Sequence, residues 1–293
     1  MSVNERKVAF LEALKKFASG LSANVSSGQE WTVKGFIDIK KKIYTISSDT
    51  KIVSKILEIH LFPLLNIFAE QNGYDLELAS CQNYYPDLTF ILKEDKNIKF
   101  AVDLKTTYRD EKNDEFCNGF TLGSHGEYFK DRTSSKNIQY PYEQYLGHFC
   151  LGVIYSRGDI SRDEELKVYE FTELEKIRSV IKNFIFFAEE KWKIASDKGG
   201  SGNTANIGSI RCIEDLINGN GVFASAGEDI FDNYWQNFNV LQITLPGGSS
   251  KKLTSLKEYL EYRGLPETLY NAPRSKYNAP RSKRRQRRER DGQ

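Results

Sequence analysis

The stretch Asn83-Tyr84-Tyr85-Pro86-Asp87, separated by fifteen residues from Asp103-Leu104-Lys105, decides the fold expected for this chain. Apolar residues alternate along residues 98–105, which predicts a half-buried β-strand. A second strand is expected over residues 87–93, so that Asp87 opens it. If these two strands pair as a hairpin, the carboxylates of Asp87 and Asp103 meet at one end of the pair.

The spacing of Asp103 and Lys105 gives this arrangement its chemistry. Residues two apart on a strand project from the same face, while Leu104 between them points into the core. Two carboxylates suit Mg²⁺, which takes few protein ligands and completes its shell with water and phosphate. An adjacent ammonium can neutralise charge that develops on a phosphate. The alternative interpretation, solvated charges at strand ends, stays open on the motif alone.

Outward from this pair, hydrophobic periodicity predicts alternating helices and strands. For a helix over residues 51–71, the stretch Ser48-Asp49-Thr50 supplies N-cap chemistry, a break or kink is expected at Pro63, and Gly73 fits the C-terminal end. Two segments rich in aromatic residues, 142–149 and 171–193, are expected to be helical, and residues 109–135 and 198–209 to be loops. The other expected helices span residues 7–18, 228–238 and 256–262, and the other expected strands span residues 33–39, 43–46, 74–78 and 151–155.

Composition indicates an ordinary globular protein of the cytoplasm. The chain has 293 residues, 39% hydrophobic and 28% charged, which is enough to bury a sizeable core. No apolar run near the length of a membrane span is expected, and the N-terminal segment lacks the apolar core of a secretory signal. The four cysteines show no zinc-ligand spacing and are expected to be unpaired thiols.

Positive charge is concentrated at the end of the chain. Residues 271–293 hold nine Lys/Arg against two Asp/Glu, a net +7, which leaves 33 basic and 38 acidic residues, a net −5, in the rest. The heptad YNAPRSK at residues 270–276 is repeated without change at 277–283, before an Arg-rich block. Such a segment has little to bury, so residues 265–293 are expected to form a disordered basic tail after a single folded domain, residues 1–264. The tail either contacts phosphates or is an inconsequential duplication.

A second segment of interest, residues 199–206, reads GGSGNTAN. Glycines let a backbone approach a base edge closely, and an asparagine can pair with adenine in the major groove. The alternative is a flexible surface loop, which its composition equally fits. No Gly-Lys-Ser/Thr closes the segment, so it is not a phosphate-binding P-loop.

Several blocks together resemble the type II restriction endonucleases of the PD-(D/E)xK nuclease superfamily. They are SDTK at residues 48–51, NYYPDLT at 83–89, AVDLKTTY at 101–108, FTLG at 120–123 and SGNTANIGSI at 201–210. Their order and spacing cover roughly residues 8–264. The resemblance implies an α/β fold, a restriction-endonuclease-like core in which a central mixed β-sheet is flanked by helices.

The resemblance also implies roles for single residues. Asp87 and Asp103 are expected to be catalytic Mg²⁺ ligands, Lys105 the catalytic lysine, and Glu58 an auxiliary acidic residue at the metal, although a helix-surface charge is an equal alternative for Glu58. The positions expected to contact DNA, through a base-reading loop, a second loop near the minor groove and the phosphate backbone, are Gly200, Ser201, Gly202, Asn203, Thr204, Asn206, Gln82, Asn83, Lys51, Thr106, Thr107 and Lys136. Cys81 and Tyr84 depart from the family pattern in the second loop.

The activity implied is Mg²⁺-dependent hydrolysis of both strands of double-stranded DNA by a homodimer. Because the base-reading loop matches so closely, the expected site is the palindrome GATATC, cut bluntly at its central step, which is flexible and easily kinked. A cognate DNA methyltransferase in the same cell is the expected functional partner, and no membrane is involved. Two other interpretations stay open: a repair or junction-resolving nuclease of the same broad fold, and a DNA-binding module without activity. The intact Asp87, Asp103 and Lys105 argue against the second.

Overall fold

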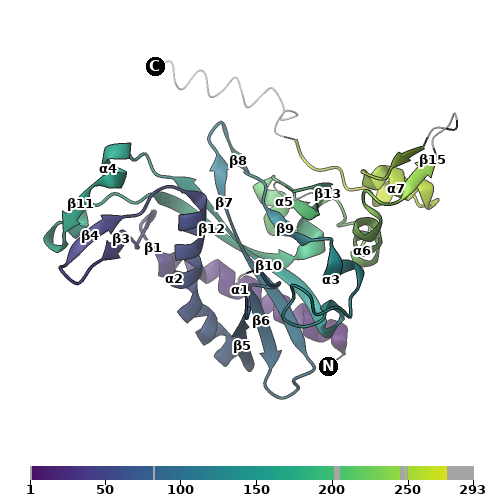
Figure 1. The fold of residues 1–293 in the computed structure, drawn as a ribbon, viewed down its shortest axis with the longest axis horizontal. Helices are drawn as coiled ribbons and strands as arrows, with labels where there is room; N and C mark the ends of the chain where they lie inside the picture. The colour runs from purple at the N-terminus through teal and green to yellow at the C-terminus, as the bar shows by residue number, and fades with distance from the viewer. Residues whose placement is uncertain (1, 82, 201–204, 245–247, 249, 276–293) are drawn as a thin grey trace.

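The centre of the molecule is a mixed sheet of eight strands. The computed structural model describes residues 2–81, 83–200, 205–244, 248 and 250–275. The strand order is β1-β2-β12-β10-β7-β6-β5, with β8 paired to β7; β10 and β7 are parallel and the other pairs antiparallel (Figure 1). The strands are β1 (Ser26–Ser27), β2 (Glu30–Trp31), β5 (Tyr74–Leu78), β6 (Leu88–Leu92), β7 (Lys99–Asp110), β8 (Asn113–Cys117), β10 (Tyr145–Arg157) and β12 (Ile181–Glu190).

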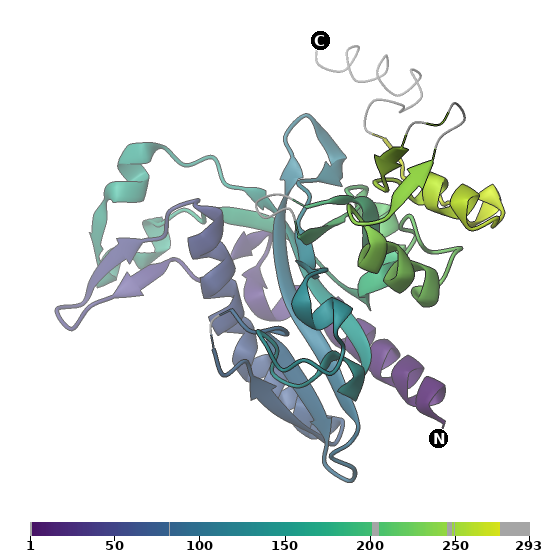
Figure 2. The same cartoon turned by 45° about the vertical axis from the view of Figure 1, so that its right-hand side comes forward.

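One face of the sheet is covered by two long helices, α1 (Val3–Val25) and α2 (Thr50–Gln71). Alternate residues of β6, β7 and β10 pack with them into one core cluster, in which the ring of Phe10 stacks on that of Phe100 with centroids 4.2 Å apart. Figure 2 shows α1 running behind the sheet, with the N-terminus on the side of the C-terminal elements. The expected α/β architecture, a mixed sheet flanked by helices, is confirmed.

The α2 helix begins as expected and continues where a break was expected. The Asp49 side chain accepts hydrogen bonds from the backbone N–H groups of Lys51 and Ile52, and Gly73 follows the helix with a φ of 77°. The helix is continuous through Pro63, so of the predicted break or kink the break is wrong. Seven buried apolar residues hold the helix on the sheet, and this packing outweighs the one backbone hydrogen bond that proline removes.

The α2 helix also corrects the expectation that no segment approaches a membrane span. By length and composition it is the one helix in the described part of the chain that is apolar enough to cross a bilayer. Its buried residues pack against the sheet together with α1, as in the core helix of a soluble protein.

The opposite face of the sheet is covered by elements that follow residue 120. A three-stranded sheet in the order β13-β14-β9 and several short helices pack there into a second core cluster. These elements are β9 (Thr121–Ser124), α3 (Glu127–Lys130), η1 (Tyr142–Gln144), η3 (Lys191–Ile194), β13 (Ala195–Gly199), β14 (Asn206–Ser209), α5 (Ile213–Asn218), α6 (Glu228–Asn237), β15 (Gln242–Thr244), β16 (Ser250–Lys252), α7 (Leu256–Tyr262) and η4 (Glu267–Leu269).

A small sheet projects from the body as an arm, on the left in Figure 1. Its strand order is β11-β4-β3, from β3 (Gly35–Ile37), β4 (Lys42–Thr45) and β11 (Val168–Glu170), and α4 (Arg162–Leu166) and η2 (Phe171–Lys176) flank β11. The arm has only a minor core of its own, formed by Ile43, Tyr169 and Ile177.

Two predicted helices are strands. Residues 142–149 form η1 and the start of β10, and residues 171–193 form η2, then β12, then the start of η3. Short apolar runs in a sequence do not distinguish a buried strand from a buried helix. Here the segments are strands because β10 pairs with β7 and β12 pairs with β10. The predicted loop at residues 109–135 contains β8, β9 and α3, and the one at 198–209 contains β14.

The first part of the expected tail is packed on the body. Leu265, Leu269 and Tyr270 lie against the C-terminal core cluster, and Asn271 donates hydrogen bonds to the carbonyls of Asn220 and Gly221. The Arg274 guanidinium pairs with Glu214 at 2.6 Å. The remainder, residues 276–293, lies outside the described residues.

Candidate active site

Asp87 and Asp103 meet at the end of a hairpin, as the sequence predicts. The β6–β7 register pairs Leu88 with Val102, and the two aspartates follow as the next opposed residues. The backbone N–H of Asp87 donates to Asp103 Oδ1 at 3.2 Å, and the N–H of Leu104 donates to Asp87 Oδ2 at 2.9 Å. These two hydrogen bonds fix the orientation of both carboxylates.

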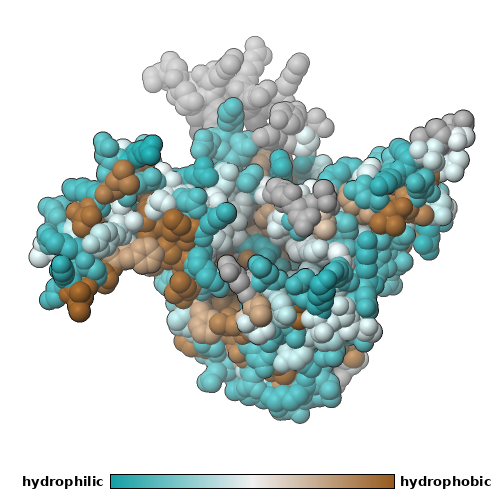
Figure 3. All heavy atoms as spheres, in the orientation of Figure 1, coloured by the Kyte–Doolittle hydropathy of each residue, from teal (hydrophilic) through white to brown (hydrophobic). Residues whose placement is uncertain are grey.

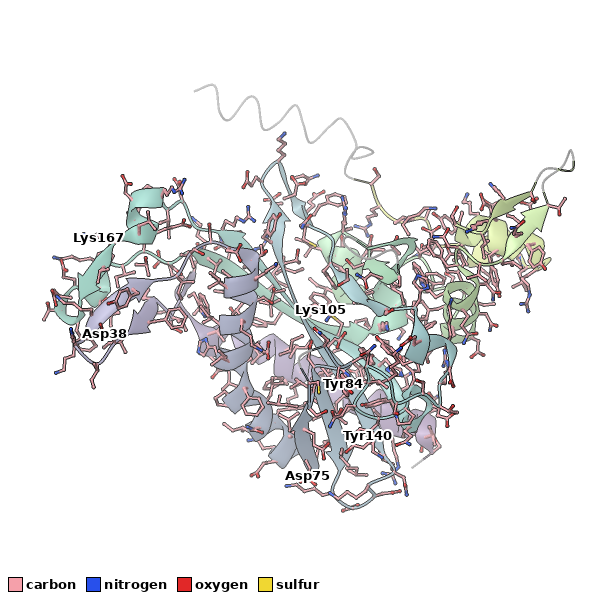
Figure 4. The ribbon with its side chains drawn as sticks, in the orientation of Figure 1. Asp38, Asp75, Tyr84, Lys105, Tyr140 and Lys167 are labelled. Carbon is pink, nitrogen blue, oxygen red and sulfur yellow. The ribbon has the colours of Figure 1, made fainter. Side chains whose placement is uncertain are left out.

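The Lys105 ammonium lies between the two carboxylates. Its Nζ is 3.1 Å from Asp103 Oδ2 and 3.6 Å from Asp87 Oδ2. Leu104, between Asp103 and Lys105, packs with the cluster on the opposite face of the sheet. The strand alternation predicted from the sequence therefore places the three polar groups on one face (Figure 4 labels Lys105 on β7).

The site carries more negative than positive charge. Burial raises the pKa of Asp87, and the charges of Asp103 and Glu58 raise it further, against the effects of Lys105 and the N–H of Leu104. Burial works to lower the pKa of Lys105, but the two carboxylates outweigh it and raise this pKa. Lys105 is therefore held as an ammonium, and the carboxylate pair remains in need of a further cation.

Glu58 lies within electrostatic reach of the pair, on α2. Its carboxylate accepts a hydrogen bond from Lys55 at 2.7 Å, one turn earlier on the same helix. Within the described ranges no three His, Cys, Asp or Glu side chains gather closely enough to form a metal cluster. The role of Glu58 as an auxiliary ligand stays a prediction.

The residues present fit a hard divalent cation. Mg²⁺ is usually bound through one or two carboxylates, with waters and substrate phosphates as its other ligands. Asp87 and Asp103 supply such a pair: the Asp87 side chain is 41% exposed and the Asp103 side chain 8%. The pair is thus supported from the core and open on one side to solvent.

The expected base-reading loop connects the paired strands β13 and β14. The Gly200 N–H donates to the carbonyl of Asn206 at 2.8 Å, where β13 and β14 come together. A Cβ at Gly200 would lie 2.8 Å from the Thr121 side chain, so a close approach requires glycine there. Ser201, Gly202, Asn203 and Thr204 lie outside the described residues, as does Gln82.

The other expected DNA contacts lie on different elements, and not all of them are exposed. Lys51 is exposed in the first turn of α2, and Asn83 is exposed in the turn before β6. Lys136 is exposed and pairs with Glu127 at 2.6 Å. Thr106 is half-buried, whereas Thr107 is buried and its hydroxyl donates to the carbonyl of Asn118 at 2.6 Å, so Thr107 has a structural hydrogen bond.

The sequence did not reveal a layer of buried polar and aromatic residues beneath the site. The Tyr85 hydroxyl hydrogen-bonds His148 Nδ1 at 2.8 Å, and the His148 ring stacks on that of Tyr142 at 3.7 Å. Lys191, at the start of η3, lies buried over the Tyr85 ring. The only feature of the sequence that pointed to this layer was the position of Tyr85 directly before Pro86 and Asp87.

Comparisons with known proteins agree with this geometry. The family model described as "Restriction endonuclease EcoRV" matches residues 27–264. The chain is also 40% identical over 219 residues to the type II restriction enzyme EcoRV of Escherichia coli, a match that covers 74% of this chain and 86% of that protein.

Proposed function

This chain belongs to the EcoRV family of type II restriction endonucleases, and from that membership we propose that it cuts both strands of GATATC at the centre, leaving blunt ends, with Mg²⁺ as cofactor. As a type II restriction endonuclease it is a site-specific deoxyribonuclease, and its substrate is DNA. The observation that carries the proposed chemistry is the contact of Lys105 with both Asp87 and Asp103.

We assign Asp87 and Asp103 as the Mg²⁺ ligands, with Glu58 as the auxiliary acid. Bound there, Mg²⁺ would lower the pKa of a water that it binds and would offset negative charge on the phosphate. Lys105 donates hydrogen bonds to the attacking water or to a phosphate oxygen and stabilises the charge that develops there. Asp87 and Asp103 keep this ammonium at the reacting phosphate.

The proposed sequence specificity rests on the segment around Gly200 and Asn206. The block SGNTANIGSI supplies an asparagine for adenine and a threonine methyl for thymine, and paired strands hold both of its ends. We assign Gly200, Ser201, Gly202, Asn203, Thr204 and Asn206 to base reading, Gln82 and Asn83 to the second loop, and Lys51, Thr106, Thr107 and Lys136 to backbone contacts.

We further propose that the enzyme works as a homodimer, because a palindrome presents the same half-site twice. The arm offers a surface for this contact. Its exposed apolar residues include Phe36, Tyr44 and Val168, which the strand registers place in one row across β3, β4 and β11. One catalytic and DNA-binding domain followed by a basic tail, and a cytoplasmic location beside a cognate methyltransferase, complete the proposal.

The proposal is tested by digestion of DNA of known sequence with the purified protein and Mg²⁺, followed by mapping of the ends. We expect a single cut between T and A of GATATC on each strand, and none when Mg²⁺ is chelated. Staggered ends or another recognised sequence would overturn the proposed specificity. Cleavage that survives chelation would overturn the metal assignment.

A further inference from the structure

Lys191 is a buried cation whose position the fold alone does not explain. The residue is only 3% exposed, and its Nζ has no hydrogen-bond partner among the described residues. Instead the Nζ lies over three rings, those of Tyr85, Phe129 and Tyr142, at 5.0, 5.5 and 5.8 Å from their centroids. We call these three rings the aromatic cage.

Packing by itself would favour an apolar residue at this position. An unpaired buried ammonium carries a large desolvation penalty, and cation–π contacts shielded from water return only part of it. Burial lowers the pKa of Lys191 to about 8, with the charges of Asp103 and Asp232 acting against that shift. A methionine would fill the same volume without this penalty.

Ion pairing with the neighbouring acids does not explain Lys191 either. Glu189 pairs with Lys15 at 2.8 Å, and Glu190 pairs with Lys7 at 2.6 Å and Lys193 at 2.8 Å. Both carboxylates therefore form ion pairs with other lysines, and neither accounts for the ammonium of Lys191.

On one side, the ammonium lies over Tyr85, in the turn that leads into Asp87; we call this the Tyr85 turn. Tyr85 directly precedes Pro86 and Asp87, so the position of its ring governs how the chain enters the metal site. The ring is held by its stack on Tyr128, with centroids 5.3 Å apart, and by the hydrogen bond between its hydroxyl group and His148. Asp103 is close enough for its charge to raise the pKa of Lys191.

On the other side, the ammonium meets the strands that hold the base-reading loop. Lys191 begins η3, which leads directly into β13 and Gly200. Gly123 of β9 has a φ of 87°, and a Cβ built on it would lie 3.4 Å from the Lys191 Nζ. β9 pairs with β14, the strand that leaves the loop. The Lys191 side chain therefore bridges the two functional parts of the site.

We propose that Lys191 is a positioning residue, which fixes the Tyr85 turn, and through it Asp87, relative to the strands of the base-reading loop. The inference rests on the proposed function and adds to it a specific connection between recognition and cleavage. Lys191 acts through the aromatic cage and touches neither substrate nor metal.

The test is Lys191→Met, measured by thermal unfolding and by steady-state cleavage of the cognate site and of a site with one base pair changed. We expect a melting temperature equal to or above that of the wild type, because a buried charge is replaced by an apolar group of similar volume. We also expect kcat to fall about 10-fold or more with KM changed less than about twofold, since the ammonium acts on the geometry of the transition state and not on DNA binding. The preference for the cognate site should fall as well.

Lys193→Met is the matched control, because it removes the ammonium two residues away that pairs with Glu190; kcat and selectivity should remain at wild-type values. Phe129→Leu removes one ring of the cage from outside both functional parts and should lower kcat in the same direction. If Lys191→Met does not fold, the kcat of Phe129→Leu tests the inference: a lowered kcat supports it and a wild-type kcat overturns it.

Wild-type kcat and selectivity in a folded Lys191→Met would overturn the inference, as would a loss of activity that only tracks a loss of folded protein. All comparisons use whichever site the wild-type enzyme is found to cut. A wrong recognition sequence would therefore refute the proposed specificity without deciding the role of Lys191.

Discussion

At the scale of single residues, the site is an unbalanced group of charges on an otherwise apolar hairpin. One ammonium, that of Lys105, faces the carboxylates of Asp87 and Asp103, with Glu58 close enough to affect the pKa of Asp87. Such an arrangement is unfavourable for the free protein, because buried like charges repel. In the proposed function it becomes favourable when a divalent cation and a DNA phosphate bind, so the proposed catalytic residues would be held there at the expense of stability.

Removing the charge of Asp103 or that of Lys105 is expected to abolish cleavage. Asp103→Asn removes a metal-binding charge and Lys105→Met removes the donor to the phosphate, so each should lower the single-turnover rate by at least about 10²–10³-fold. Both variants should remain folded, as judged by thermal unfolding. Asp75→Asn is the control, because Asp75 lies on the neighbouring strand β5, pairs with Lys96 and is outside the site. Undiminished cutting by either active-site variant would remove the assignment.

At the scale of elements, what could be predicted depends on how local the determining contacts are. The β6–β7 hairpin was predictable because alternation and a short connection are visible in sequence, and its register then brings Asp87 opposite Asp103. β10 and β12 were mistaken for helices because their pairing is decided by distant strands. Lys191 was missed for the same reason: in sequence it lies among Lys and Glu residues, and only the fold encloses it in aromatic rings.

The α1 helix is fixed to the rest of the molecule by ion pairs as well as by its apolar face. Lys7 Nζ lies 2.6 Å from Glu190, at the end of β12, and 2.5 Å from Glu228, at the start of α6. The Lys7 side chain is 14% exposed and the Glu190 side chain 9%. This shielding makes the contact stronger than a pair on the open surface.

Lys7→Met is expected to lower the free energy of unfolding at pH 7 by about 1–3 kcal/mol, since a charge-assisted hydrogen bond is removed. Burial works to raise the pKa of Glu190, but its bonds to Lys193 and Lys7 outweigh burial and lower this pKa below 4.5. Stability from a carboxylate with a lowered pKa is present above the unfolded value and is lost as pH falls through the folded value. Glu228, whose pKa burial raises, becomes protonated first.

The difference between wild type and Lys7→Met should therefore shrink on acidification, starting above pH 4.5 and continuing below it. Denaturant unfolding at a series of pH values measures this. Lys34→Met, which breaks the more exposed pair with Glu30, should change stability by no more than about 1 kcal/mol. A difference for Lys7→Met that stays constant with pH would show that Glu190 and Glu228 are not its partners.

At the scale of the whole molecule, the arm exposes apolar surface that the body does not cover. Phe36, Tyr44 and Val168 form a row across its three strands, and Ile39, in the connection between β3 and β4, is 99% exposed. Figure 3 shows apolar residues gathered on this projection. A projection with so small a core and so much exposed apolar surface is typical of an element that pairs with another copy, and a two-fold contact uses the same patch twice.

Phe36→Glu and Val168→Glu are expected to give monomers, because each places two charges close together at a two-fold contact. Sedimentation velocity at micromolar concentration should show the mass of one chain, and cleavage of both strands in one binding event should be abolished. Val240→Glu is the matched control, an exposed apolar residue on the C-terminal side that should leave the dimer intact. A wild-type mass for both arm variants would exclude the arm as the interface.

The basic end of the chain acts, if it acts at all, on the whole enzyme–DNA complex. Truncation should retain residues 1–275, because Asn271 and Arg274 contact the body through Gly221 and Glu214. The removed residues 276–293 hold eight Lys/Arg and two Asp/Glu. If they neutralise phosphates, the truncated protein binds DNA more weakly, and the slope of log K against log salt becomes shallower by about 0.9 for each phosphate that is no longer neutralised.

Anisotropy titrations without metal at about 50–200 mM salt, concentrations over which phosphate neutralisation changes affinity by orders of magnitude, measure this slope for both proteins. A full-length variant with the basic residues of 276–293 replaced by glutamine separates charge from length. We expect it to match the truncated protein, and both to retain the cleavage position, since the proposed catalytic residues lie on the β6–β7 hairpin. An unchanged slope in both would mean that the duplicated heptad and the Arg block do not bind DNA, and that the positive charge that binds the phosphates belongs to the body of the enzyme.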